Sequence, residues 1–227
     1  MQAVLALWGA TAWLGLAPVD LEEARDRQDR AALENALVGL RQQAEKRRNE
    51  AGAHYQLALA ASYLAEVALE VRDRPAAKAA AEAGIRAAER AVALQPEVSE
   101  HHRILGTLCG QIIPANLLMA FRYGDCAQRS VQKAIDLDPK SAPAYLSRGV
   151  GSYYLPPAFG GGVEAAIRDF EKALEMDPRL AEAHLWLGIA LRKAGRNADA
   201  RRALTRSLEL NPRRVWTKQQ LEKTPAR

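Results

Sequence analysis

The sequence predicts an all-α protein in which pairs of helices repeat along the chain and stack into a solenoid. Alanine is abundant, only 6% of the 227 residues are aromatic, and β-branched runs are absent, so helix is favoured over strand throughout. Four segments also end in a similar apolar pattern closed by proline, at Pro96, Pro139, Pro178 and Pro212. The intervals between these prolines are 43, 39 and 34 residues, which is the period expected of helical repeats.

The shortest interval contains the most regular unit, residues 181–212. Gly195 separates its two amphipathic segments, where a residue just past a helix end often needs a positive φ. The unit resembles a tetratricopeptide repeat, which has small residues at its eighth and twentieth places, here Gly188 and Ala200. Leu204 fills the twenty-fourth place and Pro212 the thirty-second. The resemblance implies a right-handed superhelical solenoid whose concave side is lined by the first helix of each pair.

The copies divide the chain into seven parts. Relative to a 34-residue unit, the second and third copies are longer by 9 and 5 residues, and the extra residues fall at 111–125 and 155–162. The parts are an apolar N-terminal segment (1–19), a degenerate half-repeat of N-terminal helices (20–50), the first tetratricopeptide-like repeat (51–96), a second repeat with an insertion (97–139), a third with a Pro/Gly loop (140–178), a fourth (179–212) and a C-terminal capping helix (213–227).

Residues 1–19 contain no charged side chain, which fits the apolar part of a secretory signal or a membrane anchor. No basic residue precedes the run, however, and Pro18 follows the small-residue site at its end. The alternative is a buried first helix that packs on the solenoid. We therefore expect a periplasmic or secreted protein, with a cytoplasmic one as the alternative. Membrane contact is expected only if this segment is an uncleaved anchor.

The net charge of +5 is modest, and basic residues alternate with acidic ones along the chain. A nucleic-acid surface would need a one-sided basic stripe with aromatic residues between the charges. The pattern instead indicates solvated helix faces, and no nucleic-acid partner is expected.

The histidines indicate packing positions in the repeats. His54, His102 and His184 each stand four residues before a small residue of their own copy, where the family carries an aromatic ring between the two helices. Spread one to a repeat, they lie too far apart to share a metal ion. No Ser-His-Asp grouping, HExxH motif or phosphate-binding glycine loop occurs. We expect no catalytic residue, no metal site, no cofactor and no enzymatic activity.

Cys109 and Cys126 flank the first insertion. In an exported protein they could pair and hold that segment, and the alternative is two buried free thiols.

The second insertion has the sequence LPPAFGGG over residues 155–162. Its prolines stiffen the segment, its glycines permit positive φ, and Phe159 is expected to pack back onto the protein. A Pro-x-x-Phe-Gly-Gly insertion within a repeat is similar to one in bacterial tetratricopeptide proteins related to the T component of TRAP-type periplasmic transporters. A looser similarity exists to the repeat domain of the regulators of microtubule dynamics. Otherwise the segment is a loop that lengthens the helix pair.

The family resemblance also predicts which residues line the concave groove. They come from the first helix of each repeat: Tyr55, Tyr63, Arg103, Leu146, Val150, Tyr153, Tyr154, Leu185, Ile189, Arg192 and Lys193. The set is apolar and aromatic in its middle and basic toward its C-terminal end. It suits an amphipathic helix or an extended apolar peptide, which predicts a non-catalytic scaffold for a protein or peptide partner. The alternative is a periplasmic transporter accessory that binds a solute-binding protein or a small apolar ligand, in a closed cavity near Tyr153, Tyr154 and Phe159. Part of the groove could instead be covered by the N-terminal segment or the inserted loops.

Overall fold

The computed structural model describes residues 19–115 and 117–226, and every regular element within them is a helix. The predicted helical solenoid is confirmed. The signal or anchor predicted for residues 1–19 falls almost wholly outside the described residues. No described helix combines the length and hydropathy needed to cross a bilayer.

The chain begins with a short and a longer helix, α1 (Leu21–Asp26) and α2 (Arg30–Lys46). The carboxylate of Asp20 accepts the backbone N–H groups of Glu22 and Glu23, and Asp29 accepts that of Ala32, so both helices begin at an aspartate cap.

Four helix pairs follow, and one lies within each of the four repeat ranges. They are α3 (Ala51–Glu70) with α4 (Arg74–Leu94), α5 (Ser99–Ile112) with α6 (Leu117–Leu137), α7 (Ala142–Tyr154) with α8 (Val163–Met176), and α9 (Ala181–Lys193) with α10 (Asn197–Leu210). A last helix, α11 (Val215–Glu222), packs on α10. Gly195, between α9 and α10, has a φ of +79°, as its place after a helix predicts.

Small residues at the eighth place let the two helices of a pair approach closely. A Cβ atom at Gly106 would lie 2.6 Å from Val131, one at Gly149 would lie 2.5 Å from Phe170, and one at Gly188 would lie 2.6 Å from Leu204. Each neighbour is a core residue on the second helix of the pair. The repeated glycine therefore sets the spacing within the pairs.

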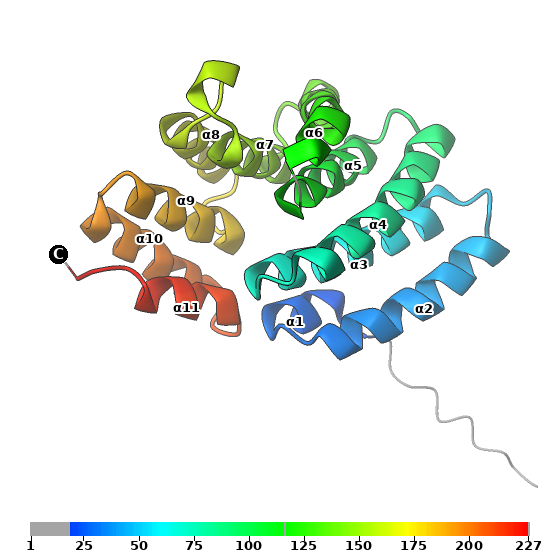
Figure 1. The fold of residues 1–227 in the computed structure, drawn as a ribbon, viewed down its shortest axis with the longest axis horizontal. Coiled ribbons are helices and arrows are strands. Elements are labelled where there is room, and N and C mark those ends of the chain that lie inside the picture. Colours follow the sequence, from blue (N-terminus) through cyan, green and yellow to red (C-terminus); the bar gives the residue numbers. More distant parts are fainter. Residues whose placement is uncertain (1–18, 116, 227) are drawn as a thin grey trace, which may run out of the picture.

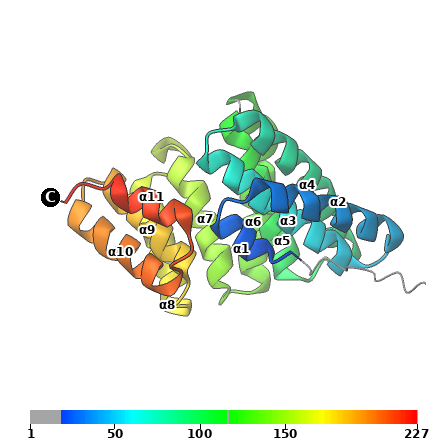
Figure 2. The ribbon, with the colours of Figure 1, turned by 90° about the horizontal axis from the view of Figure 1, so that it is seen from below.

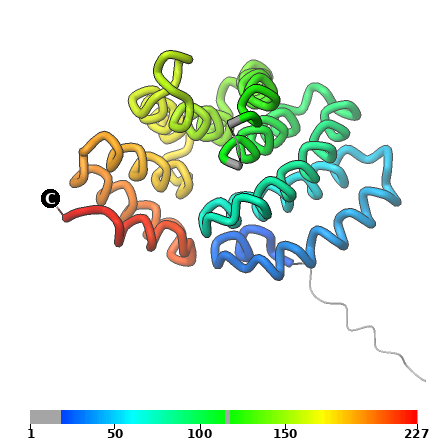
Figure 3. Tube along the Cα trace, in the orientation of Figure 1, coloured from blue at the N-terminus to red at the C-terminus, as the bar shows by residue number. Residues whose placement is uncertain are grey.

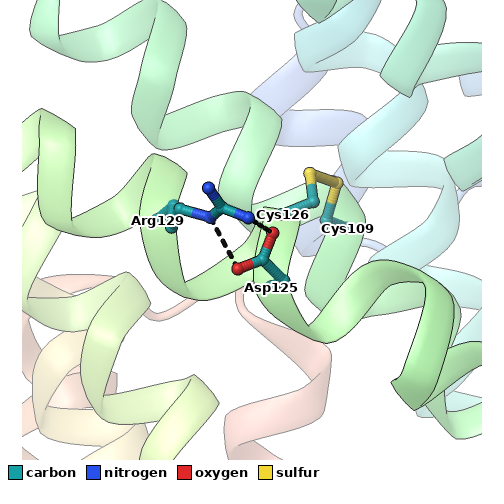
Figure 4. The surroundings of a disulfide bond; sticks show 4 residues. All are labelled: Cys109, Asp125, Cys126 and Arg129. Atoms are coloured by element: carbon teal, nitrogen blue, oxygen red, sulfur yellow. Dashed lines mark hydrogen bonds and ion pairs between the residues drawn. A yellow bond between two sulfur atoms is a disulfide. The ribbon is translucent and has the colours of Figure 1, made fainter.

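The two insertions take different structures. Residues 111 and 112 end α5, a 3₁₀ turn (Ile113–Ala115) follows, and residues 117–125 form the first turns of α6. A disulfide joins Cys109 of α5 to Cys126 of α6, with their Cα atoms 6.0 Å apart (Figure 4). The sequence left open whether these cysteines pair or stay as free thiols, and in the structure they form a disulfide.

Residues 155–162 form a loop around a second 3₁₀ turn (Pro157–Phe159). The loop is closed by backbone hydrogen bonds, including one of 2.8 Å from the N–H of Gly162 to the carbonyl of Ser152. A Cβ at Gly161 would collide with the carbonyl oxygen of Leu155, which explains the glycine there. The expectation that Phe159 packs back was wrong: its side chain is 73% exposed, because the backbone bonds close the loop without it.

The helix pairs curve into a closed arc, and the turn before α11 meets α1 (Figure 1). The tube in Figure 3 shows the start of the red helix α11 next to the blue helices at the other end of the described chain. Seen from below, the N-terminal helices lie on the right and the C-terminal helices on the left (Figure 2). One large apolar cluster fills α1 to α6, and smaller clusters fill α7 to α11.

Candidate functional site

The first helices of the four pairs, α3, α5, α7 and α9, follow one another around the arc and contact each other in sequence. We call the face along these four helices, which the family resemblance predicts to be concave, the concave strip. The strip is polar over α3 and α5 and aromatic over α7 and α9.

In the polar part, the Tyr55 hydroxyl donates to the Glu100 carboxylate at 2.9 Å, and Arg103 donates to the same carboxylate. Arg103 also donates to the Ser147 hydroxyl on α7 at 3.4 Å. Burial, and then the charge of Glu100, raise the pKa of Tyr55 to about 12. Burial alone would raise the pKa of Glu100, but the hydrogen bonds from Arg103 and Tyr55 lower it. These side chains are therefore held in fixed positions by their own network.

The aromatic part is a cluster that we call the aromatic patch: Tyr153, Tyr154, Trp186 and Trp216. The Trp186 ring centroid lies 5.9 Å from that of Tyr153, 6.2 Å from that of Tyr154 and 5.2 Å from that of Trp216. Tyr154 is 60% exposed, so the patch offers apolar ring surface to a partner. The Lys193 ammonium lies 4.2 Å from the Tyr153 ring centroid and adds a positive charge at its edge.

The other predicted groove residues fall into two groups. Leu146 and Val150 are half-buried beside the aromatic patch. Leu185 and Ile189 are core residues, 0% and 5% exposed, in a cluster with Trp216 of α11. Arg192 donates to the backbone carbonyl and side-chain amide oxygen of Gln220. Leu185, Ile189 and Arg192 contact the C-terminal helix α11, which covers that end of the predicted groove. The sequence had suggested the N-terminal segment or the inserted loops as the segments that cover part of it.

Tyr63, at the other end of the strip, lies beneath Arg25 of α1, whose guanidinium carbon is 4.9 Å from the ring centroid. Phe159 does not close a cavity over Tyr153 and Tyr154, because its own side chain faces solvent.

Sequence reasoning missed the most buried ionic cluster in the described chain. Arg214, the residue before α11, is 1% exposed. It donates to Glu66 and Glu70 on α3 and, at 2.7 Å, to Glu182 on α9, and its Nε lies 3.7 Å from Asp26 of α1. We call these five residues the Arg214 latch. The signal available beforehand was the i, i+4 pair of glutamates on an otherwise apolar helix.

The latch contains more acidic than basic groups, because its four carboxyl groups face two guanidinium groups, those of Arg214 and the neighbouring Arg25. Burial raises the pKa of Glu66, and burial together with the charge of Glu66 raises the pKa of Glu70 to about 7 against the pull of Arg214. Glu182 differs: burial would raise its pKa, but Arg214 and Arg25 lower it.

The side chains of three histidines lie within hydrogen-bond distance of backbone carbonyl groups. The Nε2 atom of His54 lies 3.1 Å from the carbonyl oxygen of Arg48. In the same way, Nε2 of His102 lies 2.7 Å from the carbonyl oxygen of Pro96, and Nε2 of His184 lies 3.0 Å from that of Pro178. In each case the carbonyl is six residues earlier, so the three rings occupy one repeated structural slot. No three His, Cys, Asp or Glu side chains gather as metal ligands within residues 19–115 and 117–226.

Comparison with known proteins agrees with this geometry. Residues 161–221 match the sequence model of a tetratricopeptide repeat family. The solved structure of TTC0263, described as a thermophilic tetratricopeptide protein of Thermus thermophilus, superposes with a TM-score of 0.63 at 17% identity, covering 88% of this chain and 97% of that one. PilF of Pseudomonas aeruginosa superposes with a TM-score of 0.50 at 17% identity, covering 76% and 68%. No curated protein sequence matches the chain.

Proposed function

We propose that this chain, a helical solenoid whose residues 161–221 match a tetratricopeptide repeat model, is a non-catalytic scaffold that binds a protein or peptide partner on its concave strip. The observation that carries the proposal is the aromatic patch, which stays accessible although the C-terminal helix covers the residues behind it. Rigid aromatic rings with polar neighbours are the usual anchors of protein interfaces.

The partner segment that fits best is an amphipathic helix or an extended apolar peptide. Leu146, Val150 and the aromatic patch supply apolar contact, while Lys193 provides positive charge beside Tyr153. The polar network around Arg103 is already satisfied internally, so binding there does not have to order free side chains.

The test uses peptides selected from a random library on the wild-type protein. Tyr154→Ala removes the most exposed ring of the patch and is expected to weaken peptide binding by about tenfold or more, as for a hot-spot residue. Phe121→Ala is the matched control, since Phe121 is an 89% exposed ring on α6 outside the strip. Equal dissociation constants for Tyr154→Ala and wild type, measured by calorimetry, would contradict the proposal.

We also propose that the protein works in an oxidising compartment, the periplasm or the cell exterior. The supporting observation is the Cys109–Cys126 disulfide, since structural disulfides form and persist mainly in exported proteins. Alkylation of native extracts before reduction is expected to leave both cysteines unmodified. Recovery of the protein from the cytoplasmic fraction with two alkylated cysteines would refute it.

A further inference from the structure

The Arg214 latch connects the two ends of the solenoid. Its guanidinium contacts α3 on one side and α9 on the other, which are the first and last helices of the concave strip. Beside it, Asn211 donates to Asp26 at 2.6 Å, and Gln219 donates to Gln28 at 3.3 Å. We call this set of contacts between the ends the seam.

The seam differs in chemistry from the contacts between successive helix pairs along the arc, which we call the joints. Each successive joint contains apolar side chains: Ile85 and Leu108 share a cluster across α4 and α5, and Val131 and Ala144 share one across α6 and α7. The same holds for Ala173 and Ala183 across α8 and α9. Among the described residues, no apolar cluster joins α1 or α3 to α9, α10 or α11.

We propose that the seam opens and closes in the folded protein, and that the closed seam covers the part of the concave strip where α3 and α9 meet. Because no described apolar cluster spans the seam, separating it breaks ion pairs and hydrogen bonds, whereas separating any other joint would break a packed core. Water can replace the lost contacts of every seam group, because each is charged or polar. Desolvation also offsets much of the attraction in a buried ion cluster, so the closed form gains little net free energy from it.

Opening would uncover the strip where the ends now meet. In the closed form Arg214 fills the space between Glu66 and Glu70 of α3 and Glu182 of α9, and Arg25 of α1 lies 3.7 Å from Glu182 across the seam. A helical segment could then enter from the side of the arc and reach α3 and α9 together. This part of the inference rests on the proposed binding function, but the opening itself does not.

The first experiment measures opening without any partner. Spin labels on Val38→Cys and Lys218→Cys, both exposed, report the distance between the two ends by double electron–electron resonance. The native cysteines are paired and do not take the label. Arg214→Ala is expected to lengthen and broaden the distance distribution. The control is Arg202→Ala, which removes a 75% exposed arginine of α10 paired to Asp199 outside the seam.

The wild-type distribution in the Arg214→Ala protein would overturn the proposal. Should Arg214→Ala unfold, because four carboxylates lose their buried cation, the double variant Asn211→Ala/Gln219→Ala serves instead. It removes the neutral contacts to Asp26 and Gln28 and leaves the latch charges paired, so a smaller lengthening is expected.

The second experiment measures access to the strip. Carbodiimide labelling of Glu70, whose side chain is 2% exposed beneath Arg214, is expected to rise several-fold in the Asn211→Ala/Gln219→Ala variant, which keeps Arg214. Labelling of Asp169, which is paired to Arg148 within the α7–α8 pair, should stay constant. Unchanged Glu70 labelling in a protein whose ends have separated would refute the claim that the closed seam covers this part of α3. Because neither readout uses a peptide, a failure of the binding proposal is distinguished from a failure of the seam proposal.

Discussion

At the scale of single residues, the repeat fixes a few positions by close packing. Gly149 and Gly151 lie on the same helix two residues apart, and their surroundings are opposite. A Cβ at Gly149 would press on the fully buried ring of Phe170, while a Cβ at Gly151 would meet nothing within 4 Å. The sequence identified Gly149 from its repeat position, and the structure shows the contact that requires it.

Gly149→Ala is therefore expected to destabilise the protein. Overpacking a rigid core costs about 1–3 kcal/mol, which exceeds the ~0.5–1 kcal/mol that alanine gains over glycine in a helix. Gly151→Ala, the control, receives only that gain and is expected to be stabilising. Urea unfolding at equilibrium measures both, and similar shifts of the two midpoints would show that the close approach is unimportant.

Glu70 provides a residue-scale prediction about pH. Burial raises its folded-state pKa from 4.5 to about 7, and its neighbours are Arg214, Glu66 and Gln28. Between pH 4.5 and about 7, the Glu70 carboxyl group is protonated in the folded state and deprotonated in the unfolded state. The stabilising contribution is thus fully present below about pH 4.5 and is lost as pH rises through 7, on the order of 3 kcal/mol in all. Melting temperatures should fall from pH 5.5 to 8 in wild type.

The control for this prediction is Glu70→Gln, whose side chain stays neutral and keeps an acceptor for Arg214. Its melting temperature should fall less over the same pH interval. If the two proteins show parallel pH profiles, Glu70 does not titrate in this range.

At the scale of elements, the two insertions form different structures because they differ in their content of proline and glycine. The first lacks a helix breaker from Leu117 onward except Gly124, so it extends α6, and the disulfide fixes this extension to α5. The second has two prolines and three glycines and forms a loop. The positions of both insertions were predictable from the repeat period; the exposure of Phe159 was not, since it depends on how the loop closes.

The disulfide is expected to contribute to stability by constraining the unfolded chain. Its cysteines are 17 residues apart, for which the loop-closure effect is about 3 kcal/mol. Cys109→Ala/Cys126→Ala should lower the urea midpoint, and a reducing agent should lower it in wild type only. Equal midpoints for oxidised wild type and the double variant would contradict this role.

At the scale of the whole molecule, one large apolar cluster fills an N-terminal part, α1 to α6, and smaller clusters fill a C-terminal part, α7 to α11, with one small cluster joining α6 to α7. In a repeat protein each unit contacts mainly its neighbours, so a core defect is felt mostly nearby. The seam joins the two parts only through polar groups, and it should transmit little of such a defect.

Phe170→Ala is expected to cost about 3–5 kcal/mol and to raise amide exchange in α7 to α10 far more than in α2 to α4. Leu33→Ala, in the N-terminal cluster, should give the reverse pattern. Uniform loss of protection in both variants, measured by hydrogen–deuterium exchange, would show that the arc unfolds as one unit.

The sequence by itself determined the helices and the repeat, because these follow from local periodicity and fixed places in a unit. Only the tertiary structure decided how the ends meet. Arg214 stands 144 residues from Glu70, in a basic stretch that indicates a solvated surface, and no periodic pattern links such residues. Its burial among carboxylates results from the accumulated curvature of all the pairs, which no single unit encodes.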